Sequence, residues 1–343
     1  MALSKCVYVR VVSFALGICL LFCGCGSSVI AEDRVKDDLP LLDPKDGVAK
    51  DVSVELYYRL TGEAYLVPIT RNVSVRANER TETAIIRTLL EGVPQQTLSS
   101  NVSALFPAGT SIVDVSLDSG ILYVTLSPEF LDESIVESVR RAGNAFGSYE
   151  AALQRAEEEL YLTRRLGIYS LVNTLTGYVE GKMRVQILVD TDGTGKGSRL
   201  PMETLGLSTG KDLDSDLIEP LDYHAEAVVS PERIVNCMLS RMVNGEFEMA
   251  YALFMEAAAG GVQKPTYANF ETEMLSLGNI TGFTILLSNE TEEGTAVITV
   301  NLDFKNAAGD LHHIENAEIL LKREGDLYKI GYGPFKSILE AAS

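Results

Sequence analysis

The stretch VDVSLDSGILYVTL, residues 113–126, decides how the first half of this 343-residue chain folds. Apolar and polar residues alternate on both sides of Ser119 and Gly120, which is the pattern of two half-buried strands joined by a tight turn. Glycine is favoured in such a turn because it adopts positive φ without steric cost. The stretch therefore predicts a β-hairpin.

A second hairpin is predicted upstream of the first. Residues 52–58 alternate into one strand, and residues 65–68 return as the other arm across a turn at 61–63. Glycine within the turn again allows the chain to reverse its direction. We therefore expect two strands at the start of the folded chain.

Two helices are predicted in the same half of the chain. The first covers residues 85–90, with Asn78 as its expected N-cap and glycine and proline directly after its end. The second is a long helical pattern over 149–180, and residues 184–189 then alternate as a last strand. The predicted order of elements is β, α, β, β, α, β.

Six short segments occur in a fixed order along this half. They are LYY at 56–58, LLEGVP at 89–94, PAGT at 107–110, VTLSPEF at 124–130, LVNTLT at 171–176 and VQILVD at 185–190. As an ordered set they resemble the sporulation and spore germination domain (GerMN), over residues 52–205. The stretch 140–159 is longer than the family pattern. The resemblance implies a small α+β domain, akin to the ring-building domains of secretion assemblies, that works by protein contact at the envelope of spore-forming bacteria.

A second folded region is predicted to begin at Ser230 and Pro231, which together form a helix-start signal. Apolar residues recur at helical spacing over 234–254 and 267–275. Four strand-like runs complete the chain, at 283–287, 296–304, 314–322 and 327–330. Helices followed by an antiparallel sheet indicate an α+β architecture. This order resembles the nuclear transport factor two-like, cystatin-like cone that is appended to many lipoproteins.

The sequence thus predicts an α+β protein with two small domains. The first is a ring-building-like βαββαβ domain, and the second is a cone of helices followed by an antiparallel sheet. The predicted segments are a lipoprotein signal peptide at 1–24, a tether at 25–51, the GerMN-like domain at 52–205, a linker at 206–229 and the cone domain at 230–343.

The first residues have the composition of an export signal. Lys5 and Arg10 supply positive charge, and residues 11–22 form an apolar run that is too short to span a bilayer. No second apolar stretch of spanning length follows. We therefore expect export, with an uncleaved apolar helix or a soluble secreted product as the alternatives.

The apolar run ends in FCGCGSS, residues 22–28. This string resembles the lipobox of bacterial lipoproteins, with Phe22 in place of the usual leucine. The resemblance implies that lipid chains such as palmitate are attached to Cys25. Two or more acyl chains anchor a protein firmly, whereas one binds only marginally. The expected location is the extracytoplasmic face of the cell membrane.

Charge and cysteine content limit the partners. The net charge is −19, and it becomes −21 when Lys5 and Arg10 leave with the signal peptide. Such a surface repels phosphate backbones and anionic headgroups, so nucleic acid is not an expected partner and the lipid must supply membrane attachment. Cys237 is the one cysteine beyond the lipobox. Neither a disulfide framework nor a thiolate metal site is therefore expected, and Cys237 is predicted to be a small buried side chain.

Two strings resemble catalytic or phosphate-binding motifs but lack their context. GLSTG, residues 206–210, fits a nucleophile elbow around Ser208, yet no strand precedes it and no helix follows, and His224 is the one nearby histidine. GTGKGS, residues 193–198, lacks the spacing of a P-loop. Both strings favour loops, so no catalytic set is predicted.

Two features resemble metal ligands. Residues 190–195 match the first half of a calcium loop, but Pro201 stands where the bidentate glutamate should be. A turn after the last predicted strand is therefore favoured. The adjacent histidines at 312–313 lie on a predicted strand and point to opposite faces, so they cannot share a metal. No metal or other cofactor is expected.

Aromatic residues in the predicted cone suggest a binding pocket. They are Tyr251, Phe254, Phe270 and Phe283. Aromatic residues at helical spacing are also typical of plain core, and core packing is the favoured interpretation.

The leading hypothesis is a noncatalytic, membrane-anchored lipoprotein that scaffolds or contacts other envelope or sporulation proteins, including copies of itself, in sporulation or spore germination. The alternative is an extracytoplasmic ligand-binding lipoprotein that holds a small apolar molecule or a cell-wall fragment in the cone. An exposed edge strand within 52–205 would favour the first hypothesis, and a deep pocket among the C-terminal helices would favour the second. A hydrolase would require a partner for Ser208.

Overall fold

The computed structural model describes residues 47–93, 101–143, 148–179, 183–207, 216–291 and 294–341. The predicted signal peptide, Cys25, Pro94 and Ser208 lie outside these ranges. Among the described residues, those within 51–74 and 80–341 belong to one compact unit, and those within 47–50 and 75–79 belong to the other. Within the smaller unit, the amide of Ala77 donates to the carbonyl of Gly47 at 2.8 Å.

The upstream hairpin is present and belongs to a three-stranded sheet. Its strands are β1 (Val48–Leu60), β2 (Leu66–Arg76) and β3 (Val102–Ser103), in the order β2-β1-β3. The turn closes with the amide of Leu60 donating to the carbonyl of Tyr65 at 2.8 Å, and Gly62 adopts a φ of 75° that favours glycine. Both strands of the hairpin are longer than the sequence pattern predicted.

Helix α3 (Thr81–Leu90) begins later than its predicted cap. Arg80 occupies the N-cap position, not Asn78. The physical reason is a turn before the helix, in which the amide of Arg76 donates to the carboxylate of Glu79 at 3.3 Å. Asn78 therefore lies within this turn, and the prediction of its role was wrong.

The hairpin predicted over 113–126 is confirmed. It consists of β4 (Ile112–Asp118) and β5 (Ile121–Leu126), with Ser119 and Gly120 at φ values of 51° and 79° in the turn. The sheet continues with β6 (Arg184–Val189), parallel to β5, and the short β7 (Ser198–Arg199). Its order is β4-β5-β6-β7, so β4 is an edge strand.

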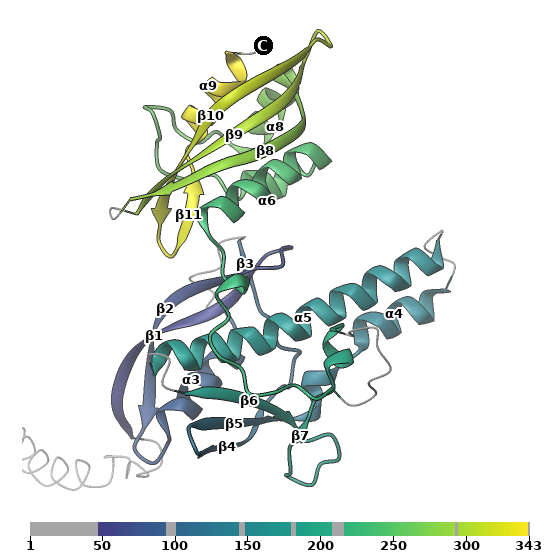
Figure 1. The fold of residues 1–343 in the computed structure, drawn as a ribbon, viewed down its shortest axis with the longest axis vertical. Coiled ribbons are helices and arrows are strands. Elements are labelled where there is room, and N and C mark those ends of the chain that lie inside the picture. Colours follow the sequence, from purple (N-terminus) through teal and green to yellow (C-terminus); the bar gives the residue numbers. More distant parts are fainter. Residues whose placement is uncertain are drawn as a thin grey trace, which may run out of the picture. The chain divides into compact units, whose positions relative to one another are not determined.

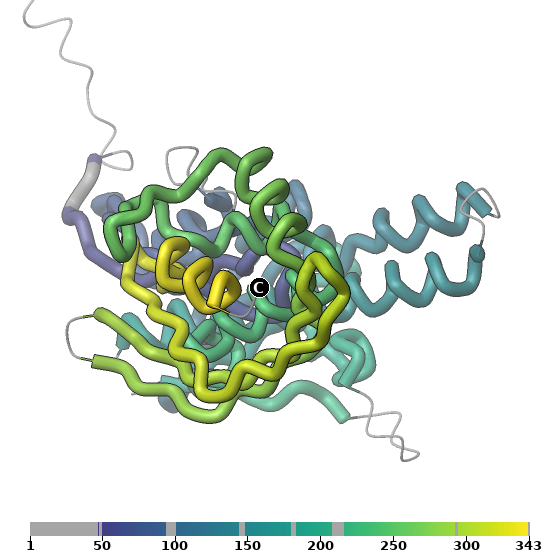
Figure 2. Tube along the Cα trace, turned by 90° about the horizontal axis from the view of Figure 1, so that it is seen from above, coloured from purple at the N-terminus to yellow at the C-terminus, as the bar shows by residue number. Residues whose placement is uncertain are grey.

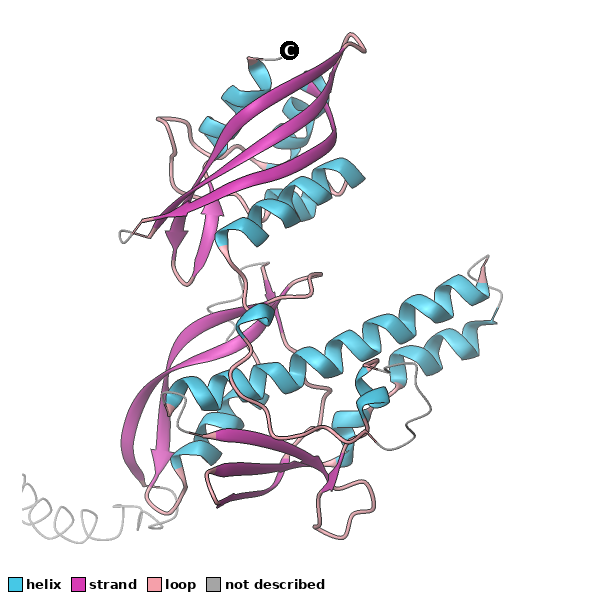
Figure 3. Ribbon diagram, viewed as in Figure 1, coloured by secondary structure: helices cyan, strands magenta, loops and turns pink. Residues whose placement is uncertain are grey.

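Two helices connect β5 to β6 after the short 3₁₀ turn Pro128–Leu131. The long helical pattern is confirmed as α5 (Tyr149–Tyr178). The stretch that was longer than the family pattern contains the end of α4 (Ser134–Ala142), which packs against α5 as a helical hairpin (Figure 3). Helix α4 was not predicted from the sequence.

Helix α5 lies across β1 and packs against β6 (Figure 1). Its polar residues complete the hydrogen bonds of β1, because the hydroxyl of Thr174 accepts from the amide of Tyr57 at 3.2 Å and the hydroxyl of Ser170 donates to the carbonyl of Tyr57. Leu171 and Val172 are fully buried between these bonds. Helix α5 therefore forms the core of the first half together with the two sheets that contain β1 and β6.

Residues 216–229, the longer described part of the predicted linker, pair with the first half of the molecule. We call this segment the strap. Leu221 exchanges backbone hydrogen bonds of 2.8 and 2.9 Å with Val185 of β6. The side-chain amide of Asn173 in α5 holds the backbone of His224, because its oxygen accepts from the His224 amide at 2.7 Å and its nitrogen donates to the His224 carbonyl at 3.1 Å. The His224 ring also stacks on Tyr169 with 4.1 Å between ring centroids.

The second half has the predicted order of helices followed by strands. The helices before the sheet are α6 (Pro231–Asn244), α7 (Phe247–Tyr251) and α8 (Tyr267–Leu277). The strands are β8 (Gly278–Glu290), β9 (Thr295–Asn306), β10 (Leu311–Glu324) and β11 (Leu327–Ile330), in the antiparallel order β11-β10-β9-β8. Ser230 caps α6 as predicted, because its hydroxyl accepts from the amide of Arg233. A last helix, α9 (Tyr332–Glu340), was not predicted.

The antiparallel sheet is curled and encloses a hydrophobic core. Figure 2 shows the sheet curving around α9. One face of β9 is buried along the whole strand, with Ala296, Ile298, Val300, Leu302 and Phe304 all inaccessible to solvent. The predicted α+β fold class, with a curled antiparallel sheet in the C-terminal half, is confirmed.

Candidate ligand pocket beside Arg241

Arg241 lies on the buried face of α6. The apolar face of this helix, with Ile234, Met238 and Leu239 fully buried, holds it against the curled sheet. Arg241 follows Met238 by three residues and therefore shares that face. It is 5% exposed. A buried arginine requires partners, because an unpaired buried charge is strongly unfavourable.

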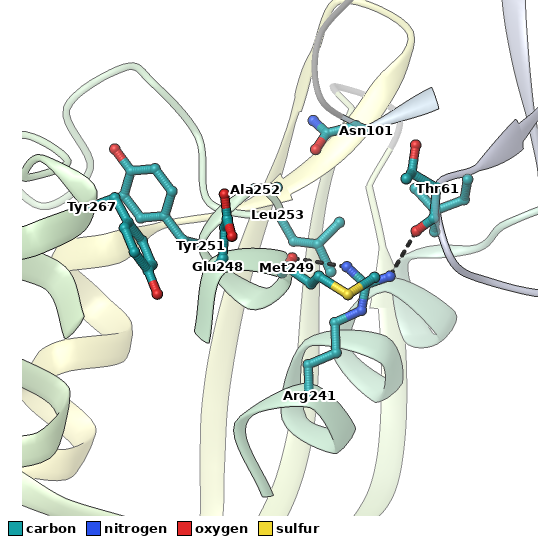
Figure 4. A pocket seen from close by; sticks show the side chains of 10 residues that line it. Thr61, Asn101, Arg241, Glu248, Met249, Tyr251, Ala252, Leu253 and Tyr267 are labelled. Atoms are coloured by element: carbon teal, nitrogen blue, oxygen red, sulfur yellow. Dashed lines mark hydrogen bonds between the residues drawn. The ribbon is translucent and has the colours of Figure 1, made fainter. Parts of the chain in front are cut away.

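The guanidinium of Arg241 finds three partners. It donates to the carboxylate of Glu63 at 2.7 Å and to the carbonyls of Thr61 and Met249 at 2.8 Å each. Figure 4 shows the bonds to Thr61 and Met249. Glu63 and Thr61 belong to the turn between β1 and β2, whereas Met249 belongs to α7. The positive charge is thus neutralised by Glu63, and the arginine joins the turn to the helices.

A pocket of about 340 Å³ lies beside this arginine. Its volume is within the range of about 300–1,000 Å³ that is typical of small-molecule sites. Its walls come from the β1–β2 turn, the start of β3, α6, α7 and the start of α8. The lining residues are Leu60, Thr61, Asn101, Arg241, Glu248, Met249, Tyr251, Ala252, Leu253 and Tyr267.

Asn101 is the unusual member of the lining. It is 3% exposed, and its carbonyl accepts from the amide of Thr61 at 2.8 Å. Its side-chain oxygen Oδ1 is buried and has no hydrogen-bond partner among the described residues. A buried acceptor without a donor costs about 1–3 kcal/mol. This unsatisfied acceptor is enclosed by the protein and is not exposed to the pocket.

The open side of the pocket is acidic and aromatic. Glu248 is exposed there and Tyr267 is half-buried, and the Tyr267 hydroxyl donates to Glu271 at 3.0 Å. Tyr251 is held by a hydrogen bond of 2.8 Å from its hydroxyl to the carbonyl of Pro265. The ammonium of Lys264 lies 4.0 Å from the centre of the Tyr251 ring, and burial lowers the pKa of this lysine.

The four aromatic residues proposed for a pocket in the cone do not line this pocket together. Tyr251 lines it, but Phe254 and Phe270 are fully buried and pack against each other with 5.4 Å between ring centroids. Phe283 lies half-buried on the edge strand β8. The structure thus places Phe254 and Phe270 in the core, which was the favoured interpretation.

The other candidates from the sequence have structural explanations. Cys237 is 3% exposed, as predicted for a small buried side chain, and burial raises its pKa to about 12.

The carboxylate of Asp190 accepts from the amides of Thr194 and Gly195 at 3.0 and 2.9 Å, which makes residues 190–195 a turn. His313 pairs with Asp303 at 2.8 Å. Within the described ranges, no group of three acidic, histidine or cysteine residues could hold a metal ion.

A second exposed feature is the free edge of β4. Val113 and Leu117 are 38% and 55% exposed. The side chain of Arg80 donates to the carbonyl of Val115 at 3.4 Å. Beside the start of the strand lies a groove of about 390 Å³ that is formed with α3. Edge strands with exposed apolar residues are sites where another strand can pair.

Sequence reasoning missed Asn101 and Arg241. One signal was available for Arg241, since it is a charge in line with the apolar face of a predicted helix. No comparable signal marked Asn101, because its burial depends on contacts with distant parts of the chain.

Comparison with known proteins finds a family match in the first half. Residues 55–192 match the Germane family, described as sporulation and spore germination. Among solved structures, the chain is similar to the tandem GerMN domains of the sporulation protein GerM from Bacillus subtilis, with 17% identity and a TM-score of 0.26. The match covers 41% of this chain and 40% of that one. No curated protein matches.

The resemblance carried by the six sequence segments is therefore confirmed, because residues 55–192 match the Germane family. The family match supports a role for the protein in sporulation or spore germination. In the described part of the chain, no helix is long and apolar enough to cross a membrane.

Proposed function

We propose that this protein is a noncatalytic lipoprotein, anchored through Cys25 on the extracytoplasmic face of the membrane, that contacts other envelope proteins in sporulation or germination. The match to the Germane family supports a role in sporulation or germination. The signal-like segment with its lipobox supports anchorage at the membrane. The observation that carries the contact is the free edge of β4, with Leu117 55% exposed.

Strand β4 suits pairing with a partner strand. Its other edge is occupied by β5 from Ile112 to Asp118, so one row of backbone groups remains for a partner. Main-chain hydrogen bonds supply affinity in this mode, and exposed alternate side chains such as Val113 and Leu117 supply selectivity. Arg80 protects the edge by holding the carbonyl of Val115 until a partner replaces it.

Photo-crosslinking from Leu117 tests this contact directly. A photoreactive amino acid is placed at Leu117 in cells that make the protein, with Leu311, which is 76% exposed, as the matched control position. We expect a specific adduct at Leu117 during sporulation or germination and none at Leu311. An adduct of twice the chain mass would identify self-assembly. The absence of any adduct at Leu117 at every stage would refute the contact.

Substitution of Cys25 tests the anchor. Because the net charge of the chain opposes the membrane surface, Cys25→Ala is expected to release the protein from the membrane fraction. Fractionation followed by immunoblotting measures this release. If the variant remained on membranes to the same extent as the parent, the lipid would not be the anchor.

A further inference from the structure

We infer that the strand that pairs with β4 belongs to a different protein and alternates apolar residues with lysine or arginine. The inference rests on the proposed contact at β4 and adds the chemistry of the partner. Three features of β4 carry it: a free backbone edge, apolar and acidic side chains on opposite faces, and aspartates that form no ion pair in the described part of the chain.

The backbone of β4 offers hydrogen bonds along one edge. Strand β5 occupies the other edge, and the bond from Arg80 to the carbonyl of Val115 marks this carbonyl as directed to the free side. Backbone groups alternate in direction along a strand, so those of Leu117 point the same way. A strand that adds to this edge therefore pairs with Val115 and Leu117.

The two faces of β4 differ in chemistry. Val115 and Leu117 lie opposite residues of β5 that are fully buried, and directly opposed residues have their side chains on the same face. Asp114 and Asp118 alternate with them and are exposed on the other face. An added strand continues both faces, so it needs apolar side chains on one and polar side chains on the other.

A groove accommodates apolar side chains of the added strand. It has a volume of about 390 Å³ and lies between α3 and the start of β4, with Leu90 and Ile112 in its lining. The arginine of the groove, Arg87, is paired with Glu91 at 3.3 Å. The charges of the groove are thus balanced, and its apolar lining favours an apolar side chain.

The acidic face defines the charge of the partner. Asp118 accepts from the hydroxyl of Ser119 at 3.1 Å, and within the described ranges neither Asp114 nor Asp118 forms an ion pair. Opposite charges that face each other across two strands stabilise the pair, and like charges destabilise it. Lysine or arginine at the opposed positions of the partner therefore completes this face.

The same charges oppose pairing with β4 of a second copy. The two-fold antiparallel register that pairs Val115 with Leu117 of the copy also places Asp114 directly opposite Asp118. Each chain in addition carries a net charge of −19, which repels the other chain. A basic strand from another protein meets neither obstacle.

Fluorescence anisotropy with three labelled heptapeptides tests the inference on the purified full chain. The first peptide alternates lysine and valine, the second alternates glutamate and valine, and the third has the composition of the first in two blocks. At about 0.15 M salt, which screens long-range attraction, we expect saturable single-site binding of the first peptide, about tenfold or more tighter than either of the others. No saturable binding of the first peptide, or equal binding of the block peptide, would overturn the inference.

Hydrogen–deuterium exchange locates the bound peptide. Saturation with the lysine–valine peptide is expected to slow exchange over residues 112–118, because outward amides of β4 gain hydrogen bonds. Strand β8 is the matched control, since it is also an edge strand but has no charged residue from 278 to 289. Unchanged exchange at β4, or equal protection of β8, would reject a specific site on β4.

Charge variants test the role of the two aspartates. The double variant Asp114→Asn with Asp118→Asn is expected to weaken the lysine–valine peptide about three- to tenfold. Glu246→Gln with Glu248→Gln removes the same amount of exposed charge away from β4 and should weaken it less than twofold. Equal effects of the two double variants would show that general attraction to the acidic chain accounts for the binding.

The photo-crosslinking experiment at Leu117 separates this inference from the proposed contact. We expect the adduct to contain a partner segment that alternates apolar and basic residues. An adduct with a second copy, or with a segment that lacks basic residues, would overturn the inference and leave the contact at β4 in place. Absence of every adduct in cells would refute the contact itself, whatever the peptides do.

Discussion

Strands β9 and β4 share an alternating apolar pattern but have opposite surroundings. β9 lies between β8 and β10, and its apolar face is completely buried. β4 has a neighbour on one side, and Leu117 is 55% exposed. Alternation therefore predicts a strand in both cases but does not predict whether its apolar face is covered. Where it is not covered, a surface for another protein is the natural interpretation.

The largest expected difference is in stability. Ile298→Ala in β9 removes apolar atoms from a fully buried position and is expected to lower the free energy of unfolding by about 2–5 kcal/mol. Thr299→Ala, on the opposite face of the same strand, serves as the control and should cost less than about 1 kcal/mol. Urea denaturation measures both. Equal losses would mean that the two faces of β9 are equivalent.

A pH titration distinguishes packing from charge in this comparison. The apolar side chains of β9 do not titrate, whereas in the first half of the chain the hydrogen bond from Arg59 lowers the pKa of Glu159. A lowered folded pKa gives stability that is complete above the unfolded value of about 4.3 and is lost as the pH falls through the folded pKa. Because Glu159 is 40% exposed, the loss should stay below about 1 kcal/mol.

The urea midpoint, followed from pH 6 towards pH 2, measures this loss. Glu159→Gln should lack that part of the pH dependence, whereas the loss of stability that arises from other acidic residues should persist. A parallel curve for the variant would contradict the assignment to Glu159.

The variant Leu117→Ala should affect stability much less than Ile298→Ala. Leu117 is already largely in contact with solvent, so its truncation is expected to change the free energy of unfolding by no more than about 0.5 kcal/mol. The same variant should reduce adducts from a photoreactive group placed at Val113. A loss comparable to that of Ile298→Ala would mean that β4 is covered after all.

The smallest effect is expected for Arg80→Ala. The bond from Arg80 to Val115 is exposed and 3.4 Å long, so its loss should cost a few tenths of a kcal/mol. Because the variant uncovers a carbonyl of the β4 edge, the yield of adducts at Leu117 should rise. A fall in this yield would indicate that Arg80 binds the partner itself.

Local patterns predicted most of the elements. The turn at Ser119 and Gly120, the length of α5 and the start of α6 at Ser230 all depend on residues that are close in the sequence. Local features also explain why two helices were not predicted. α4 is short and highly charged, and α9 begins directly after the last predicted strand.

Distant contacts could not be predicted. Arg241 and Glu63 are separated by 178 positions, and nothing in either segment indicates that the other will neutralise it. The division of the strands into separate sheets likewise depends on α5 lying over both β1 and β6. Asn101 belongs to the same class, because its burial arises from elements that are far apart in the sequence.

The strap limits where the chain can be truncated without loss of contacts. Its residues cover Tyr57 and Tyr169, and the hydroxyl of Tyr57 lies 3.0 Å from that of Tyr223. A truncated chain that ends at residue 205 would therefore expose aromatic surface and leave the Asn173 amide without its backbone partner. A truncation after residue 229 retains these contacts and should resist proteases better. Any separate study of the first half should therefore keep the strap as its last segment.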